Sequence, residues 1–409
     1  MSTVPATKVE IGFDLSALGG PFFILDDPVQ GVLDNTTYTL GGTLFYDVSD
    51  KVLSVSVNRG KSRQLDKFTA GNSNITFINQ DRAFDPLNAS SPFFGQIIPR
   101  RTVRVTTSGS AVFYGSIDDW NLQYEVSGYS TAGAVVSDGF TYLAQQVLTA
   151  HTATSQLTGA RIGAVLDRSE INWPASLRSI DTGGMTLQAD VVDDGTNALD
   201  YLQLVNFSEP GSLFMGADGS IIFRDRTEAP TSSGLVSFTD DGTGIPFVDV
   251  QVVYGSELLY NFIQIERNNG GTATASDTDS QNSYGVVALV QSNLLMSTDA
   301  QAQDLADYLL GKYSEPEYRF ERLTVVLEDL TPAEQASVLS LEIGDISQIK
   351  FTPNQTGTQI DKYASIIAIE HDIRPMSHRI TYGFETLDYA SLVLDDLIFG
   401  LLDDGRLSF

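Results

Sequence analysis

The sequence predicts a mainly β protein with a mixed α and β region in its middle. The chain of 409 residues contains 35 Gly, 16 Tyr and 22 Phe, a composition that favours strands and turns over a helical bundle. Apolar and polar residues alternate along many short segments of the first and last thirds, as they do in half-buried strands. Apolar residues with helical spacing first appear near residue 140.

The first block, residues 46–130, is predicted to be all β. Gly, Asn and Asp, which favour turns, stand between its alternating stretches. We expect Phe93, Phe94 and Trp120 to be core or interface groups rather than a platform for sugars. The alternating stretches are KVLSVSVN (51–58), SNITFIN (73–79), RTVRVTT (101–107) and AVFYGSIDDWNLQYEV (111–126).

The middle block, residues 131–234, is predicted to mix helices with strands. A helix is expected in TNALDYLQLVNFSE (196–209), where Thr196 can cap the first turn. The next stretch, SLFMGADGSIIFRDR (212–226), is expected to form a hairpin in which Asp218-Gly219 supplies the positive φ angles of a tight turn. An earlier helix is predicted in GFTYLAQQVLTAH (139–151), whose apolar face carries Phe140, Leu143, Ala144, Val147 and Leu148.

The third block, residues 235–388, is predicted to contain strands and two helices. One helix begins at Thr298 with Gln301 three positions later, and the other begins at Thr331-Pro332 with Glu334, so both carry a capping box. Residues 268–283 are small and polar and are expected to form a mobile loop. The predicted strands are VQVVYG (250–255), NFIQIERN (261–268), YGVVALV (284–290), RLTVVLE (322–328), ISQIKF (346–351), ASIIAIEHDI (364–373) and RITYGFE (379–385).

The sequence carries no recognisable catalytic motif. It has no Cys, which excludes disulfides, thiolate metal sites and Cys nucleophiles. A phosphate-binding loop, a GxGxxG turn, an HExxH helix and a GxSxG elbow are all absent. The three His, at 151, 371 and 378, are expected to be structural or solvated. We therefore expect a non-enzymatic protein with no catalytic, cofactor-binding or metal-binding residues and no cofactor.

Charge is distributed unevenly along the chain. The net charge is −28, yet residues 51–104 carry nine Lys or Arg against three Asp, which leaves −34 on the remainder. Complementary fields orient protein contacts, so we expect this basic island at contacts with an acidic neighbour; the alternative is that it is merely solvated. A negative exterior repels phosphates, so sequence-specific binding of DNA or RNA is not expected. The abundance of acidic residues is also typical of proteins from a saline habitat. The predicted interface residues of the island are Arg59, Lys61, Arg63, Arg100, Arg101 and Arg104.

One short phrase occurs at both ends of the chain. FFILDDPVQGVLDN (22–35) aligns without a gap with SLVLDDLIFGLLDD (391–404). Two interpretations stay open: a shared docking role, or amphipathic turns that converged on one pattern. Gly400 and Pro28 argue against one long helix, so we expect short hooks whose apolar side chains insert into neighbouring proteins. The predicted docking residues are Leu25, Leu33, Leu394, Leu397, Ile398, Leu401 and Leu402.

No stretch near the start has the charged and apolar regions of a signal peptide, and no apolar run is long enough to cross a bilayer. We therefore expect synthesis in the cytoplasm, a soluble chain and no membrane insertion by it.

Part of the first block resembles a known family. The stretch from Val57 to Thr106 is similar to the N-terminal module of minor tail proteins, or baseplate hubs, of long-tailed bacteriophages. VFYGSIDDW (112–120) resembles the closing strand of that module, and two later segments, 197–226 and 340–351, resemble its middle region and last barrel in the family's order. The residues that carry the first likeness are Arg59-Gly60, Ser62, Leu65-Asp66, Ala70-Gly71, Asn79, Asp81, Phe84-Asp85-Pro86, Asn88, Ser91-Pro92 and Pro99.

The resemblance implies a hub at the tip of the virion tail, made in the host cytoplasm. It implies a homotrimer whose two tail-tube-like β-barrel domains flank the mixed α/β block and form a ring around a DNA channel. Its partners would be other copies of itself, the distal tail and tail tube proteins, and a downstream tip or fibre protein; passing DNA would not be bound specifically. The expected domains are an N-terminal arm (1–45), a first barrel (46–130), a middle domain (131–234), a second barrel (235–388) and a C-terminal docking segment (389–409).

Two alternatives remain at this point. Within the same particle, the distal tail ring protein is a hexamer with a barrel and a carbohydrate-type domain. Outside it, a β-rich glycan-binding or glycoside-cleaving protein fits the composition, although such a secreted protein would need a signal peptide.

Overall fold

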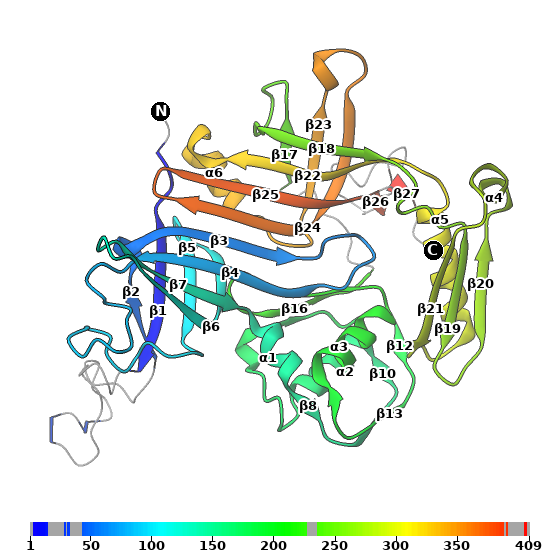
Figure 1. The fold of residues 1–409 in the computed structure, drawn as a ribbon. Coiled ribbons are helices and arrows are strands. Elements are labelled where there is room, and N and C mark those ends of the chain that lie inside the picture. The colour runs from blue at the N-terminus through cyan, green and yellow to red at the C-terminus, as the bar shows by residue number, and fades with distance from the viewer. Residues whose placement is uncertain are drawn as a thin grey trace.

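The computed structural model describes residues 3–14, 28–29, 31–32, 43–226, 235–387, 390–391 and 405–406. These residues are mainly β, with a mixed α and β middle, as the sequence predicts. Their largest element is a sheet of 13 strands (Figure 1). We find no closed barrel within the described ranges, because the two β blocks join in this one sheet. Of the helices described, none is long and apolar enough to cross a membrane.

The large sheet is almost wholly antiparallel. Only β17 (Val236–Thr239) runs parallel to its neighbour β23 (Ile346–Phe351), which in turn pairs with β24. Across the rest of the sheet the order is β18 (Asp249–Tyr254), β22 (Tyr318–Val326), β25 (Ser377–Thr386), β24 (Ile360–Arg374), β3 (Val52–Gly60), β4 (Thr69–Ile78), β7 (Ser130–Ser137), β6 (Ser110–Tyr124), β5 (Thr102–Thr107), β1 (Thr7–Asp14) and β2 (Thr43–Asp47).

The pairing of β3 with β24 joins the first and third blocks. Val55 to Gly60 lie opposite Ile373 to Ala368, with Val57 facing His371. Gly60 has a φ of +115° at the end of this ladder. A Cβ atom there would lie 2.2 Å from the carbonyl oxygen of Ile367, so only Gly allows the two backbones to approach this closely.

The middle region packs three helices against short strands below the large sheet (Figure 1). The helices are α1 (Gly139–Gln145), α2 (Thr158–Leu166) and α3 (Ala198–Phe207). A three-stranded sheet is formed by β11 (Arg178–Ile180), β16 (Ile221–Arg224) and β15 (Ser212–Met215). Short pairs join β8 (Val147–Leu148) to β14 (Thr196–Asn197), β9 (His151–Ala153) to β13 (Asp190–Val192), and β10 (Gln156–Leu157) to β12 (Thr186–Leu187).

Several local predictions for this region need correction. The first helix ends at Gln145, because Val147 and Leu148 pair as a strand instead. The cap of α3 is Asn197, whose side-chain oxygen accepts from the Asp200 N–H, and not Thr196. The hairpin of β15 and β16 is confirmed, but only Gly219 of its turn has a positive φ. Helix α2 was not predicted.

The third block adds a smaller layer beside the large sheet. Strands β20 (Thr272–Ser276), β19 (Phe262–Arg267) and β21 (Ala288–Leu294) form a sheet that packs on α5 (Asp299–Tyr313). The capping boxes of α5 and α6 (Pro332–Leu339) are confirmed. The prediction of a mobile loop at 268–283 was wrong: this stretch forms β20 and α4 (Thr278–Tyr284), with Ala273 and Ala275 buried under α5. Far along the chain, β26 (Ala390–Ser391) pairs in parallel with β27 (Gly405–Arg406).

The buried side chains of the described residues form three hydrophobic clusters. One lies between β1 and the first block, around Phe13, Phe77 and Phe84. The largest lies between the middle region and the large sheet, where α1, α2 and α3 contribute beside Phe320 and Tyr382. The third lies between α5 and its sheet. Full burial of one such large side chain stabilises a fold by about 1.5–3 kcal/mol, so the middle region is held firmly against the third block.

We predict that Gly60→Ala weakens the junction of the two β blocks. The positive φ alone costs about 1–3 kcal/mol for a residue other than Gly, and the clash with the β24 backbone adds to it. Gly109→Ala is the matched control, since Gly109 has a φ of +90° and no atom within 4 Å of the added Cβ. Urea unfolding should show a clearly larger loss for Gly60→Ala; equal losses would contradict the close approach.

Candidate functional site

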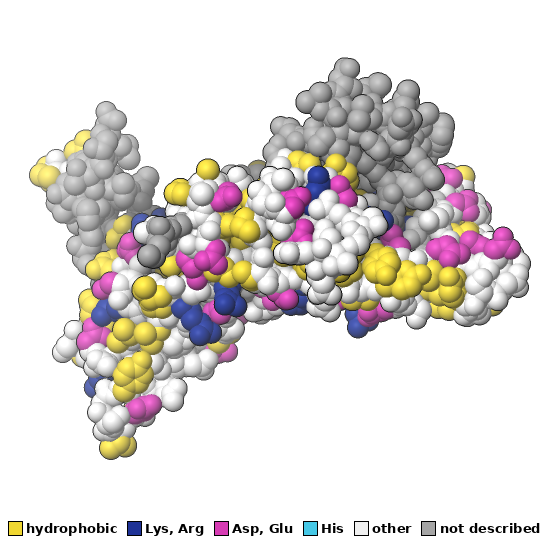
Figure 2. Space-filling view, turned by 90° about the horizontal axis from the view of Figure 1, so that it is seen from above, with side chains coloured by type: hydrophobic (Ala, Val, Ile, Leu, Met, Phe, Trp, Pro, Cys, Tyr) yellow, Lys and Arg dark blue, Asp and Glu magenta, His cyan; other side chains and the backbone are white. Residues whose placement is uncertain are grey.

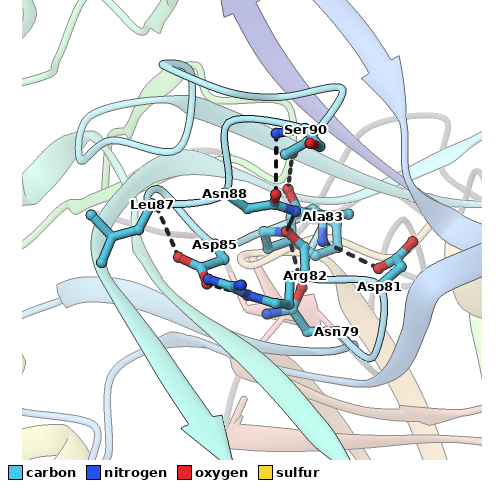
Figure 3. A network of polar contacts seen from close by, with 10 residues as sticks. Asn79, Asp81, Arg82, Ala83, Asp85, Leu87, Asn88 and Ser90 are labelled. Carbon is cyan, nitrogen blue, oxygen red and sulfur yellow. Dashed lines mark hydrogen bonds and ion pairs between the residues drawn. The ribbon is translucent and has the colours of Figure 1, made fainter.

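The candidate site is a surface for protein contacts, built from the loop of residues 79–101 and the basic island. The loop crosses from the end of β4 to the start of β5 and contains most of the motif that carries the family likeness. We call it the 79–101 loop. Its shape follows from its own side chains, as Figure 3 shows.

Short polar side chains fold the 79–101 loop through a series of turns. The Asn79 side-chain oxygen accepts from the Phe84 N–H at 2.9 Å, and Asp81 accepts from the Ala83 N–H at 3.2 Å. Asn88 accepts from the Ser90 N–H at 3.1 Å. Asn and Asp favour such turns because their side chains satisfy backbone N–H groups two or more residues on. The loop is therefore held in one conformation by local contacts (Figure 3).

Asp85 is the central acid of the 79–101 loop. Its carboxylate accepts from the Leu87 N–H at 2.8 Å and from the Arg82 guanidinium at 2.6 and 2.8 Å. The Leu87 N–H, and after it the Tyr124 hydroxyl and Arg82, hold the pKa of Asp85 below its ordinary value although burial opposes them. Arg82 itself has a φ of 54°, a conformation that costs a non-Gly residue free energy and that this ion pair helps to maintain.

Aromatic side chains anchor the loop to the first block. Phe84 stacks on Phe77, with ring centroids 4.5 Å apart, and on Trp120 at 5.8 Å. Phe93 stacks on Phe84 at 5.6 Å and is buried. Phe93 is a core group, as the prediction of a core or interface role allows, and Trp120 is partly buried against the same cluster. The next residue, Phe94, is 51% exposed.

The anchored loop presents apolar side chains to solvent. Leu87 is 84% exposed, and Phe94 and Ile98 are also exposed. Exposed apolar groups on a well-ordered frame are typical of protein contact surfaces. Sequence analysis missed Leu87 and Ile98. The dense run of Asp-Pro, Ser-Pro and Asn turns was the available signal, since it marks an ordered loop rather than a flexible one.

Two residues of the basic island are used inside the chain. Arg59 is only 3% exposed; its guanidinium donates to Glu342 at 2.8 Å and to the carbonyl oxygen of Met215 at 3.3 Å. Glu342 also accepts from the Ala217 N–H. Arg59 therefore ties the middle region to the third block and offers almost no surface to another subunit, which corrects its expected role at a contact.

Lys61 also faces its own chain. Its ammonium lies 3.4 Å from the carboxylate of Glu385, which pairs with Lys312 as well. Burial would raise the pKa of Glu385, but Lys312 and Lys61 outweigh it and lower that pKa to about 2. The Glu385 carboxylate is thus ionised at neutral pH. Through its two lysine partners it holds the loop after β3 against β25 and α5.

The remaining island residues reach solvent in two separate places. Arg63 is exposed and pairs with Glu257 at 3.0 Å, beyond β18. The others lie at the end of the 79–101 loop and on β5: Arg100 lies 3.6 Å from Asp118, Arg101 donates to Gln96 at 2.5 Å, and Arg104 pairs with Glu10. The island is therefore not one continuous patch, and on the face in Figure 2 Lys and Arg lie among Asp and Glu.

The docking residues of the repeated phrase cannot be placed on this surface. They lie outside the described residues, so their role stays a prediction: Leu25, Leu33, Leu394, Leu397, Ile398, Leu401 and Leu402.

The His residues do not assemble a metal centre. His371 and His378 are buried, with Nδ1 of the first 3.0 Å from Nε2 of the second. Burial lowers the pKa of both, that of His378 to about 4, so the pair is neutral at pH 7. Across the part of the chain that the structure describes, no three His, Asp or Glu are grouped to hold a metal ion.

Comparison with solved structures identifies relatives in fold. The chain is similar to the 43 kDa tail protein of prophage MuSo2 from Shewanella oneidensis, with a TM-score of 0.57 and 12% identity over 93% of this chain and 98% of that one. It is also similar to the tail protein from Neisseria meningitidis MC58, with a TM-score of 0.57 and 9% identity over 84% of this chain and 94% of that one. No family model matches the chain, and no curated protein matches its sequence. The resemblance to phage tail proteins is confirmed at the level of the fold.

We predict that Asp85→Ala unfolds the 79–101 loop locally. Loss of the carboxylate leaves the Leu87 N–H and Arg82 without their partner, which costs about 1–3 kcal/mol. Hydrogen exchange over residues 79–101 should accelerate accordingly, whereas Asp66→Ala, at an exposed position, should leave it unchanged.

The same carboxylate gives a pH dependence with a defined sign. Because the folded pKa of Asp85 is lowered, its stabilisation is complete above the unfolded pKa of about 4 and is lost as pH falls through the folded pKa. The difference in stability between the wild type and Asp85→Asn should therefore shrink below about pH 4. A difference that grows on acidification would contradict this assignment.

Proposed function

We propose that this chain is a structural subunit of a phage tail tip, a hub that forms a ring and continues the tail tube around the DNA channel. The observation that carries the proposal is the fold shared with two tail proteins, one of them from a prophage, over nearly their whole length. The proposal includes a non-enzymatic role, the virion tail as location and the five-part domain division expected from the sequence.

The edges of the large sheet support self-association. Within the described ranges β18 pairs only with β22, and β2 pairs only with β1, so each leaves one side without a strand partner. Both strands also carry exposed apolar side chains, Tyr254 on β18 and Leu44 and Tyr46 on β2. Open edges of this kind accept another strand. Pairing of two unlike edges is head-to-tail and closes into a ring when the rotation allows it.

The charge distribution supports a ring around DNA. Residues outside the basic island carry −34, and a negative lumen repels phosphates so that DNA can slide. In this arrangement Arg63, Arg100, Arg101 and Arg104 meet acidic neighbours in the tube or in the next subunit. The hooks of the repeated phrase would hold the distal tail protein at one end and a downstream tip or fibre protein at the other.

Copy number in the virion tests the proposal. We expect three copies in a ring at the tail tip, measured by cryo-EM of tails and by mass photometry of the purified ring. A stable monomer that is absent from the tail tip would refute the proposal. Six copies would assign the chain to the distal tail ring instead.

We predict that reversal of charge beside the 79–101 loop blocks assembly. In the double variant Arg100→Glu and Arg101→Glu, one exposed and one half-buried cation are lost. Surface contacts of this kind are worth up to about 1 kcal/mol each, so ring yield should fall roughly tenfold. Higher salt should partly restore it, since screening weakens the new repulsion. Arg374→Glu, at an exposed Arg outside the island, serves as the control; normal assembly by the double variant would show that these residues are merely solvated.

A further inference from the structure

A buried arginine of β22 lacks any partner in the described part of the chain. Arg319 is only 6% exposed, yet its guanidinium makes no hydrogen bond or ion pair with any described residue. The other deeply buried arginines differ: Arg59 pairs with Glu342, and Arg161 donates to the Tyr201 hydroxyl and the Gln188 carbonyl oxygen at 2.9 Å. Its nitrogen atoms are not among the fully buried unpaired atoms, so they reach the space of a partly open cavity. An unpaired guanidinium held in such a cavity offers its N–H donors to a ligand.

Arg319 lines a cavity of about 240 Å³ that is partly open to solvent. The floor is the outer face of β22, β25 and β24, and the walls are the loop of residues 61–64 and the segment 257–258. In the sheet Arg319 stands opposite Val253 of β18. The cavity is therefore one strand away from the open edge of the sheet.

Among its lining residues alone the cavity has four cations and three carboxylates, because Glu385, the partner of Lys61, stands outside the lining. All its basic residues except Arg319 have acidic partners: Arg63 pairs with Glu257 at 3.0 Å, Arg322 with Glu370 at 3.1 Å, and Lys61 with Glu385 at 3.4 Å. Glu321 accepts from the Gln251 amide at 3.0 Å. The cations that line the cavity are Lys61, Arg63, Arg319 and Arg322, and the carboxylates are Glu257, Glu321 and Glu370.

We propose that the Arg319 cavity binds one carboxylate group. The planar guanidinium offers parallel N–H donors that match the two oxygens of a carboxylate. A single negative charge balances the cavity, whereas a phosphate dianion would add excess negative charge beside three glutamates. The cavity is large enough for the end of an acidic side chain.

The carboxylate has two possible sources. One is an Asp or Glu of a second copy: the chain has 52 such residues, and a copy added at the β18 edge would pass close to the cavity. The other is a small free carboxylic acid. Arg319 would bind the carboxylate in the same way from either source. This binding does not require that the chain assemble into the proposed ring.

Thermal melting with propionate, which copies the end of a Glu side chain, tests the inference. At constant ionic strength, propionate should raise the Tm of the wild type along a saturating curve, and the neutral isostere propionamide should not. Equal effects of the two ligands, or no effect of propionate, would overturn the proposal without use of any variant.

Variants then locate the site. Arg319→Met should lose the response to propionate, because Met offers no N–H donor to a carboxylate. Arg319→Lys should weaken binding at least about tenfold, since Lys lacks the planar fork. Arg374→Met, at an Arg that is 67% exposed, should behave as the wild type; an unchanged propionate response in Arg319→Met would exclude this cavity.

Sedimentation velocity separates the two sources. If a second copy supplies the carboxylate, Arg319→Met should weaken self-association and propionate should compete with it in the wild type. If self-association is unchanged while propionate binding is lost, the natural occupant is a free carboxylic acid. Loss of the ring for other reasons would leave the propionate result intact, so the two proposals can fail separately.

Discussion

The ladder between β3 and β24 is the constraint on which the rest of the structure depends. It turns the β strands of the first and third blocks into one sheet. Gly60 permits the approach of the two backbones, and Arg59, its neighbour, reaches Glu342 and the Met215 carbonyl oxygen. The same few residues thus join the two β blocks and fasten the middle region to them. The edge strands β18 and β2, as the described residues show them, and the cavity at Arg319 take their places from this continuous frame.

Local sequence signals predicted much of the secondary structure. Alternating apolar residues marked β3, β4, β22 and β25, because a half-buried strand needs that period. The two capping boxes marked the starts of α5 and α6, because their side chains satisfy backbone N–H groups within one turn. Where tertiary contacts decided, sequence analysis failed: β20 is polar except for Ala273 and Ala275, which are buried only because α5 covers them. The pairing of β3 with β24 leaves no local signal at all.

The site was predictable in composition and not in geometry. The sequence identified a basic island, but it could not tell which of its arginines form contacts within the chain. Arg59 and Arg100 look alike in sequence, yet one is enclosed by the middle region and the other reaches solvent. Phe93 and Phe94 are adjacent, yet the first is buried and the second is exposed. Arg319 stands in an ordinary alternating strand, and nothing in its local sequence distinguishes it from an arginine that has a partner among the described residues.

The long sequence separation across the central ladder also determines when the fold can be completed. Val57 cannot pair with His371 until a further 314 residues have been synthesised. At translation rates of about 5–20 residues per second, that interval is roughly 15–60 seconds. During it the first block can form its own hydrophobic cluster around Phe77 and Phe84, but the side of β3 that later meets β24 has no strand beside it. Two chains translated from one messenger RNA can therefore pair with each other at this edge of β3. The risk ends when β24 has left the ribosome and covers the edge.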